Sequence, residues 1–228
     1  MKAISKELHL LWLSHVLNEN TPLYGGGKDI HITQKKSILN GDSCNTSILN
    51  IPNHAGSHVD CPHHFIQGGI TIDAYTPEEW IFSNPLLLDV PTKSEQVIIP
   101  NDLPAIECQN ENIDLVLIRT GFEAFRGSDI FWQDGPVLLS ELATYLCKRY
   151  PSLRAVGIDA ISVSSLHHRE AGCAVHQAFL SNNIRLFEDL SLSCIRSSLS
   201  LRQVIALPLR FFWGDGAPCT VIGWEDKY

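Results

Sequence analysis

The chain has 228 residues, about one and a half times the size of a typical domain, so its length predicts a single domain over residues 1–228. Hydrophobic residues make up 44% of it and charged residues 18%, which excludes a wholly disordered protein. Seventeen Lys and Arg stand against 25 Asp and Glu, and a formal charge of −8 without a basic cluster argues against nucleic acid as a partner.

The first half of the chain reads mainly as strands. Runs typical of strands cover Leu8–Val16, Ile30–Ile38, Thr46–Ile51, Leu86–Val90 and Leu115–Arg119. Between the first two, Gly25-Gly26-Gly27 predicts a turn. Thr76-Pro77-Glu78-Glu79 predicts the start of a helix, with Thr76 and Glu79 forming a capping box and Pro77 at the first helical position.

The second half mixes helices with strands. Helical patterns cover Pro136–Arg149 and, roughly, Arg169–Leu180. Strands are expected at Ala155–Ile158, Arg185–Phe187, Val204–Leu209 and Thr220–Trp224. This mixture, with strands dominating early, favours an α/β or α+β layered domain.

The cysteines and the hydropathy of the chain indicate the cellular compartment in which the protein is expected. The seven cysteines contain no C-x-x-C pair, and their odd number suggests free thiols in a reducing cytoplasm. No apolar run approaches the length of a transmembrane helix. The stretch Leu8–Leu17 lacks a small-residue cleavage site, so no signal peptide is predicted. We therefore expect a cytoplasmic protein that does not bind membranes.

Four of the ten histidines lie between positions 54 and 64. Pro62 disfavours a helix there, and in an extended chain residues of equal parity share one face. His54, His58, Asp60 and His64 are all even-numbered, so they would project to one side, with Gly56 leaving room for an ion. Burying these groups without partners would be costly, and a divalent metal would organise them.

Other interpretations of these residues stay open. A single histidine is more often a core or surface residue than a ligand, and His176, on a predicted helix face, could equally be a core-facing residue. For Glu188, after a short strand, a solvated carboxylate at the end of the strand is the commoner outcome. Cys61, beside His63 and His64, could act as a nucleophile. A hydrolytic serine is weaker still, because the chain has no G-x-S-x-G motif. A non-catalytic metal-binding or interaction module is the main alternative to an enzyme.

The segment His54-x-Gly56-Ser57-His58-x-Asp60-x-Pro62-x-His64 resembles the HxGTHxDxPxH signature of the metal-dependent cyclase family of hydrolases, which includes bacterial kynurenine formamidase and isatin hydrolase. The resemblance extends over most of the chain. Its further motifs follow in the family's order: Leu13-Ser14-His15, Pro22-Leu23-Tyr24, Arg119-Thr120-Gly121-Phe122, Gly157-Ile158-Asp159-x-x-Ser162, Leu207-Pro208-Leu209 and Gly214-Asp215-Gly216-Ala217-Pro218.

The resemblance implies a swivelling β/β/α fold and a homodimer or higher homo-oligomer. It also implies one or two divalent metals per chain and a small-molecule substrate. The metal ligands it assigns are His54, His58, Asp60, His176 and Glu188. His64 becomes the general acid/base. Tyr24 takes a substrate-side position, and we expect Phe65 and Trp80, which are near the metal segment, to add apolar walls.

Nitrogen and oxygen ligands without thiolate suit zinc first, and also manganese or iron. The implied reaction is the hydrolysis of a C–N bond in a small aromatic or cyclic amide by metal-activated water, as in an arylformamidase. A cyclase or lactone-active enzyme of a specialised pathway is a further alternative.

The chain departs from the family pattern at a few positions. Ser57 replaces the usual threonine, and Gly25-Gly26-Gly27 replaces the more usual Pro-Gly-Asp. Ser164 stands where aspartate is common, and Thr220 where arginine is common. These changes spare the expected metal ligands but leave the substrate open.

Overall fold

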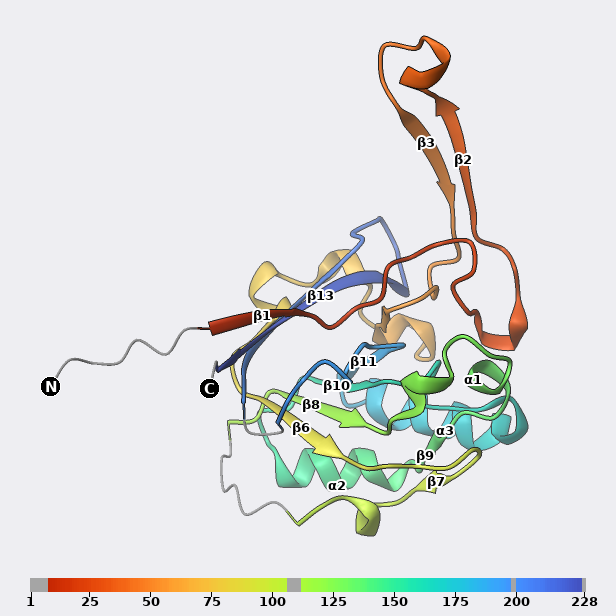
Figure 1. Cartoon of the computed structure of the whole chain (residues 1–228). Coiled ribbons are helices and arrows are strands. Elements are labelled where there is room, and N and C mark those ends of the chain that lie inside the picture. Colours follow the sequence, from red (N-terminus) through yellow and green to blue (C-terminus); the bar gives the residue numbers. More distant parts are fainter. Residues whose placement is uncertain (1–7, 106–111, 198–199, 227–228) are drawn as a thin grey trace, which may run out of the picture.

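Most strands of the protein belong to one large sheet (Figure 1). The computed structural model describes residues 8–105, 112–197 and 200–226 of the chain. Along the sheet the strands follow the order β5-β12-β13-β4-β11-β10-β8-β6, and β1 adds to β13. Their bounds are β1 Leu8–Trp12, β4 His58–Asp60, β5 Ile81–Phe82, β6 Pro85–Asp89, β8 Leu115–Arg119, β10 Ala155–Ile158, β11 Arg185–Glu188, β12 Leu201–Pro208 and β13 Gly216–Asp226.

One half of this sheet is parallel and the other antiparallel. Strands β6, β8, β10 and β11 pair in parallel, and β4 then joins β11 and β13 with antiparallel ladders on both of its edges. Short β4 is therefore the seam between the two halves. This mixed α/β architecture confirms the expected fold class.

Two small pairs of strands lie outside the large sheet. Strands β7 (Val97–Ile98) and β9 (Val137–Leu138) pair in parallel. Strands β2 (His31–Lys36) and β3 (Thr46–Asn50) form an antiparallel hairpin that extends away from the body (Figure 1). Every residue of β2 and β3 is exposed to solvent.

Each face of the sheet carries its own apolar core. On one face, α2 (Glu141–Arg149) and α3 (Arg169–Leu180) pack over the parallel strands, with residues such as Val116, Val156 and Leu186 beneath them. The opposite face buries Val59 and Phe187 with the antiparallel strands. Successive residues of a strand point to opposite faces, so neighbouring residues of β4 and β11 belong to different cores.

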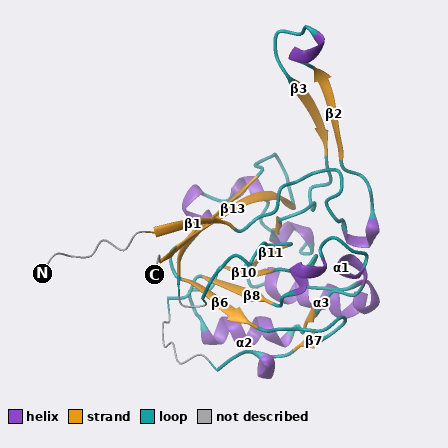
Figure 2. Cartoon of the chain, in the orientation of Figure 1, coloured by secondary structure: helices purple, strands orange, loops and turns teal. Residues whose placement is uncertain are grey.

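Most helical segments are short, as Figure 2 shows, and one helix begins later than expected. Besides α2 and α3, only α1 (Ile130–Gln133) is α-helical in the described part of the chain. The helix predicted over Pro136–Arg149 starts at Glu141, because Val137 and Leu138 pair with β7. Thr76 and Glu79 do form the capping box, but the helix they start is a single 3-10 turn, Pro77–Trp80.

The described cysteines are all free thiols, as expected, while Cys108 lies outside the described residues. Within the parts of the chain that the structure describes, no helix has the length and apolarity needed to cross a bilayer.

Candidate metal centre

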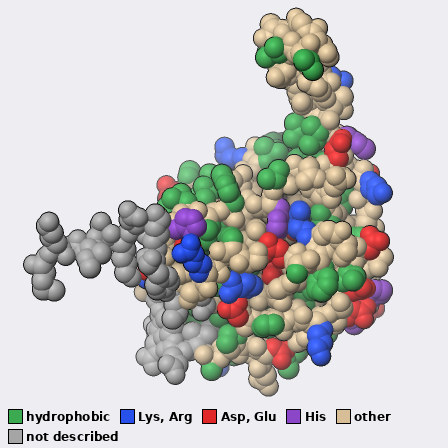
Figure 3. All heavy atoms as spheres, in the orientation of Figure 1, with side chains coloured by type: hydrophobic (Ala, Val, Ile, Leu, Met, Phe, Trp, Pro, Cys, Tyr) green, Lys and Arg blue, Asp and Glu red, His purple; other side chains and the backbone are tan. Residues whose placement is uncertain are grey.

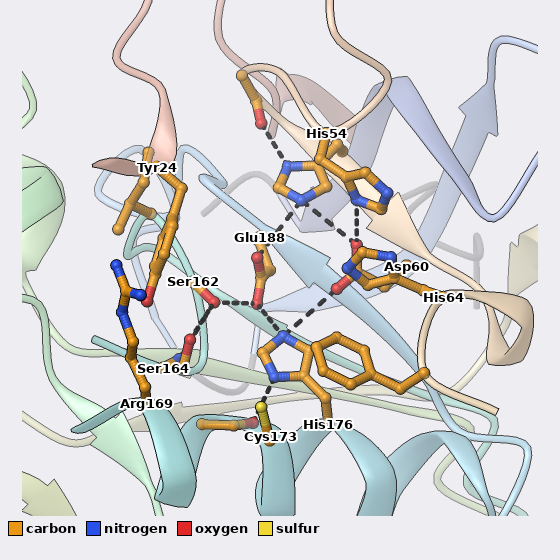
Figure 4. A pocket seen from close by; sticks show the side chains of 15 residues that line it. Tyr24, His54, Asp60, His64, Ser162, Ser164, Arg169, Cys173, His176 and Glu188 are labelled. Atoms are coloured by element: carbon orange, nitrogen blue, oxygen red, sulfur yellow. Dashed lines mark hydrogen bonds and ion pairs between the residues drawn. The ribbon is translucent and has the colours of Figure 1, made fainter. Parts of the chain in front are cut away.

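A pocket of about 360 Å³ opens on the helical face of the sheet, above β4 and β11 (Figure 4). Its lining includes all the site residues expected from the sequence except one: Tyr24, His54, His58, Asp60, His64, Phe65, His176 and Glu188. The exception is Trp80.

Sheet register brings three of these side chains together at the floor of the pocket. His58 lies directly opposite Glu188 in the ladder between β4 and β11, and Asp60 follows two residues after His58 on the same face. His58 Nε2 is 3.4 Å from Asp60 Oδ1 and 3.4 Å from Glu188 Oε2. All three residues are buried.

Helix α3 adds His176 from above the sheet. Its Nε2 is 3.5 Å from Asp60 Oδ2 and 3.4 Å from Glu188 Oε1. The helix can come this close because residue 172 is glycine: a Cβ there would lie 2.5 Å from Cβ of Ser164. Any larger residue would push α3, and His176 with it, away from the carboxylates.

The two buried imidazoles are held in one tautomer. His58 Nδ1 donates to the Gly56 carbonyl at 2.8 Å, and His176 Nδ1 donates to the Gly172 carbonyl at 2.6 Å. In their neutral forms, both rings then direct the Nε2 lone pair at carboxylate oxygens, which is repulsive unless a cation lies between them. Backbone carbonyls commonly orient metal-binding histidines in this way. The donor set fits a divalent metal ion.

Glu188 is also fixed by the turn that follows β10. Its Oε1 accepts a hydrogen bond from the Ser162 hydroxyl at 2.9 Å and another from the Val163 N–H at 2.7 Å. These bonds leave Oε2 directed at His58.

His54 lies at the edge of the cluster, where it connects two carboxylates. Its Nδ1 is 2.7 Å from Asp60 Oδ1, and its Nε2 is 3.0 Å from Asp215 Oδ2. The ring needs a glycine opposite Asp60: a Cβ at Gly216 would lie 2.5 Å from the His54 ring. His54, Asp60 and His64 form a second group of possible ligand atoms beside that of His58, Asp60 and Glu188.

The buried carboxylates of this cluster favour positive charge on the neighbouring histidines, which shifts the pKa values of both kinds of residue. Burial alone would favour neutral imidazoles, but Asp215 and Asp60 raise the pKa of His54 to about 9. Against the same burial, Asp60 and Glu188 hold the pKa of His58 well above its ordinary value. The pKa of Glu188 falls to about 2 despite burial and the charge of Asp60, because both buried imidazoles contact it. A divalent cation could replace the protons that the imidazoles retain beside these carboxylates.

His64 lies on the metal side, as expected, but the extended chain that this prediction assumed exists only over β4, and both His54 and His64 lie in turns. Pro62–His64 form a 3-10 turn, which Pro62 permits because the first helical position needs no N–H donor. The turn stacks the His64 ring on His54, with their centroids 4.0 Å apart. His64 Nδ1 is 2.8 Å from Asp215 Oδ2. Burial, the largest influence, lowers the pKa of His64 below its ordinary value.

Comparison with known proteins identifies the family of this chain. Residues 11–165 match the model of the Cyclase family, described as "Putative cyclase". The chain belongs to the Cyclase family.

Cyclase-like protein 2 of Oryza sativa subsp. japonica is 29% identical over 230 residues, covering 93% of this chain and 78% of that protein. A kynurenine formamidase of Erythrobacter litoralis (strain HTCC2594) is 24% identical over 218 residues, covering 95% of this chain and 94% of that protein. Among solved structures, an isatin hydrolase bound to the product analogue thioisatinate superposes with a TM-score of 0.80 at 20% identity, over 98% of this chain and 95% of that one. The last similarity shows a shared fold.

The aromatic residues expected at this family site are only partly brought together. Tyr24, in the 3-10 turn Tyr24–Gly26, lines the pocket, and Phe65 stacks on the His176 ring at 4.5 Å. Trp80 is different: it is 5% exposed and belongs to the core on the opposite face of the sheet, where the Arg185 guanidinium lies 4.9 Å from its ring. The sheet separates Trp80 from the pocket, which corrects its expected role as a pocket wall.

Sequence reasoning assigned no role to two residues that lie at this site. Asp215 contacts both His54 and His64, and Asn53 donates to its other oxygen at 2.6 Å. In the sequence it was marked only as part of the motif Gly214-Asp215-Gly216-Ala217-Pro218, with no role assigned to it. Arg169 lines the pocket as the first residue of α3, and no pattern in the sequence marked it.

Proposed function

We propose that this Cyclase-family protein is a metal-dependent hydrolase that cleaves the C–N bond of a small aromatic or cyclic amide, as an arylformamidase does. One observation carries the proposal: two buried histidines, each fixed by a backbone carbonyl, direct Nε2 at two buried carboxylates on the floor of a pocket. The kynurenine formamidase and isatin hydrolase relatives support it.

In this proposal His54, His58, Asp60, His176 and Glu188 hold one or two divalent ions, zinc before manganese. Such an ion supplies Lewis acidity and lowers the pKa of water from about 15.7 to about 7. Ser162 and the two backbone carbonyls keep these ligands oriented.

His64 is proposed to transfer protons. Asp215 is ionised, because its hydrogen bond with His54 holds its pKa below the usual range, so it accepts a hydrogen bond from His64 Nδ1. This bond places the proton on Nδ1 and leaves Nε2 to receive a proton or deliver one to the departing nitrogen. Tyr24 and Phe65 provide apolar walls for the organic part of the substrate.

Chelation tests the proposed function. The purified protein is assayed with two amides, formanilide and isatin, and with a small aromatic lactone, before chelation, after it, and after zinc or manganese is restored. We expect hydrolysis to disappear with the metal and return with it. Turnover that persists without metal would contradict the proposal. Turnover of lactones alone would favour the lactone-active alternative, and metal binding without turnover of either class would favour a non-catalytic module.

We also propose a homodimer or higher homo-oligomer, with the β2–β3 hairpin in the contact. The turn of the hairpin exposes Ile38 and Leu39 (60% and 94% exposed), and Figure 3 shows apolar side chains at its tip. An isolated two-stranded hairpin is marginally stable, and clustered exposed apolar residues mark interaction surfaces.

Light scattering after size-exclusion chromatography should give a mass of at least two chains, each of 25.4 kDa. An Ile38→Asp, Leu39→Asp variant should shift it toward one chain, whereas Tyr145→Gln, which removes an exposed aromatic from α2, should not. A wild-type monomer would refute this assembly.

A further inference from the structure

Arg169 places a positive charge in a pocket whose floor is acidic. Figure 4 shows its guanidinium beside the Tyr24 ring, on the other side of the pocket from His54 and His64. No other lysine or arginine occurs among the described residues that line the pocket. The pocket is therefore polarised, with the candidate metal centre at one side and a guanidinium at the other.

The fold does not require this arginine. Its side chain is exposed, and it makes no hydrogen bond or ion pair with any residue that the structure describes. It is also the first residue of α3, a position where a cation interacts unfavourably with the helix dipole. Stability of α3 thus gives no reason for a positive charge here.

A ligand can use both sides of the pocket at once. Apolar side chains, including Phe65 and Ile161, line the pocket together with the charged groups. An aromatic amide that presents its carbonyl to the metal side could therefore extend a second group toward Arg169. A guanidinium matches the planar fork of a carboxylate, and a single guanidinium balances one negative charge.

We propose that Arg169 is a specificity-determining residue that binds a carboxylate of the substrate, so that the preferred amides are carboxylate-bearing aromatic ones. The inference rests on the proposed amide hydrolase function and adds the substrate class to it. Tyr24, beside Arg169, closes the same side of the pocket.

The test compares formanilide with its 2-, 3- and 4-carboxylate derivatives, because the isomers place the charge at different distances from the amide. For the best isomer, we expect kcat/KM to exceed that for formanilide in the metal-loaded wild type. In Arg169→Gln this preference should fall about 10- to 100-fold, the range of a hydrogen-bonded charge. Arg169→Lys should keep part of it. Arg210→Gln, which removes an arginine outside the pocket, should keep all of it.

A binding measurement separates this inference from the proposed function. Calorimetry on the metal-loaded protein compares the three aminobenzoates with aniline. Weaker binding of an aminobenzoate to Arg169→Gln supports the inference even if no amide is hydrolysed, in which case the proposed function alone fails. The same carboxylate preference in wild type and Arg169→Gln, or none in the wild type, would overturn the inference.

Discussion

A double variant, His58→Ala with Asp60→Ala, is expected to purify with little or no bound metal. Both side chains lie beside Glu188 on the floor of the pocket. Asp60 also contacts His54, His58 and His176. Metal that binds only the folded state stabilises it by about 2.7 kcal/mol at a metal concentration of 100 times Kd. The wild type should therefore gain thermal stability when metal is added, and the double variant should not.

Metal content by elemental analysis and melting temperature with and without metal check this prediction. Asp60→Asn nearly preserves the shape of the buried carboxylate and should lose metal while remaining folded by circular dichroism. His31→Ala, on the exposed hairpin, serves as the matched control and should change neither quantity. Full metal occupancy in the double variant would rule out the assigned ligands.

His64→Ala is expected to keep its metal and lose about 10²- to 10⁴-fold in kcat/KM, the usual contribution of a positioned acid/base group. The reason is that Asp215 contacts Nδ1 of the ring and so fixes its orientation for the proposed proton transfer. His63→Ala should lose much less, because the His63 ring packs edge-on against Trp213, with centroids 5.5 Å apart, and does not line the pocket.

Metal content decides between the two roles that remain for His64. The nitrogen of His64 lies close enough to possible ligand atoms of His54 and Asp60 for all three to hold one ion. If His64→Ala loses metal as His58→Ala does, His64 is a ligand. If the variant keeps both metal and activity, the proton must pass through another group.

Local patterns predicted the parallel half of the sheet well. The observed bounds of β8, β10 and α3 coincide with the predicted ones. A strand buried on both faces has a continuous apolar run, and a helix packed on a sheet has one apolar stripe. Both patterns can be seen in the sequence without knowledge of distant partners. The short strand at Val137 could not be predicted, because it exists only through its pairing with Val97, which is distant in the chain.

The candidate site was predictable where the chain itself sets the geometry. Alternation places His58 and Asp60 on one face, as expected, because these residues do form a strand. His54 and His64 reach the cluster through turns, and those turns are held by contacts with Asp215. Asp215 is beyond any local pattern because its position depends on the pairing of β13 with β4.

Because β4 joins the two halves of the sheet, its pairing also limits the order in which parts of the chain can fold. Its three residues find ladder partners only in β11 and β13, the latter extending from residue 216 to residue 226. During synthesis the histidine segment therefore leaves the ribosome long before the strands that will hold it. Such long-range pairing forms late, since a large loop must close first. The candidate metal centre can therefore assemble only after β13 has been synthesised and has paired with β4.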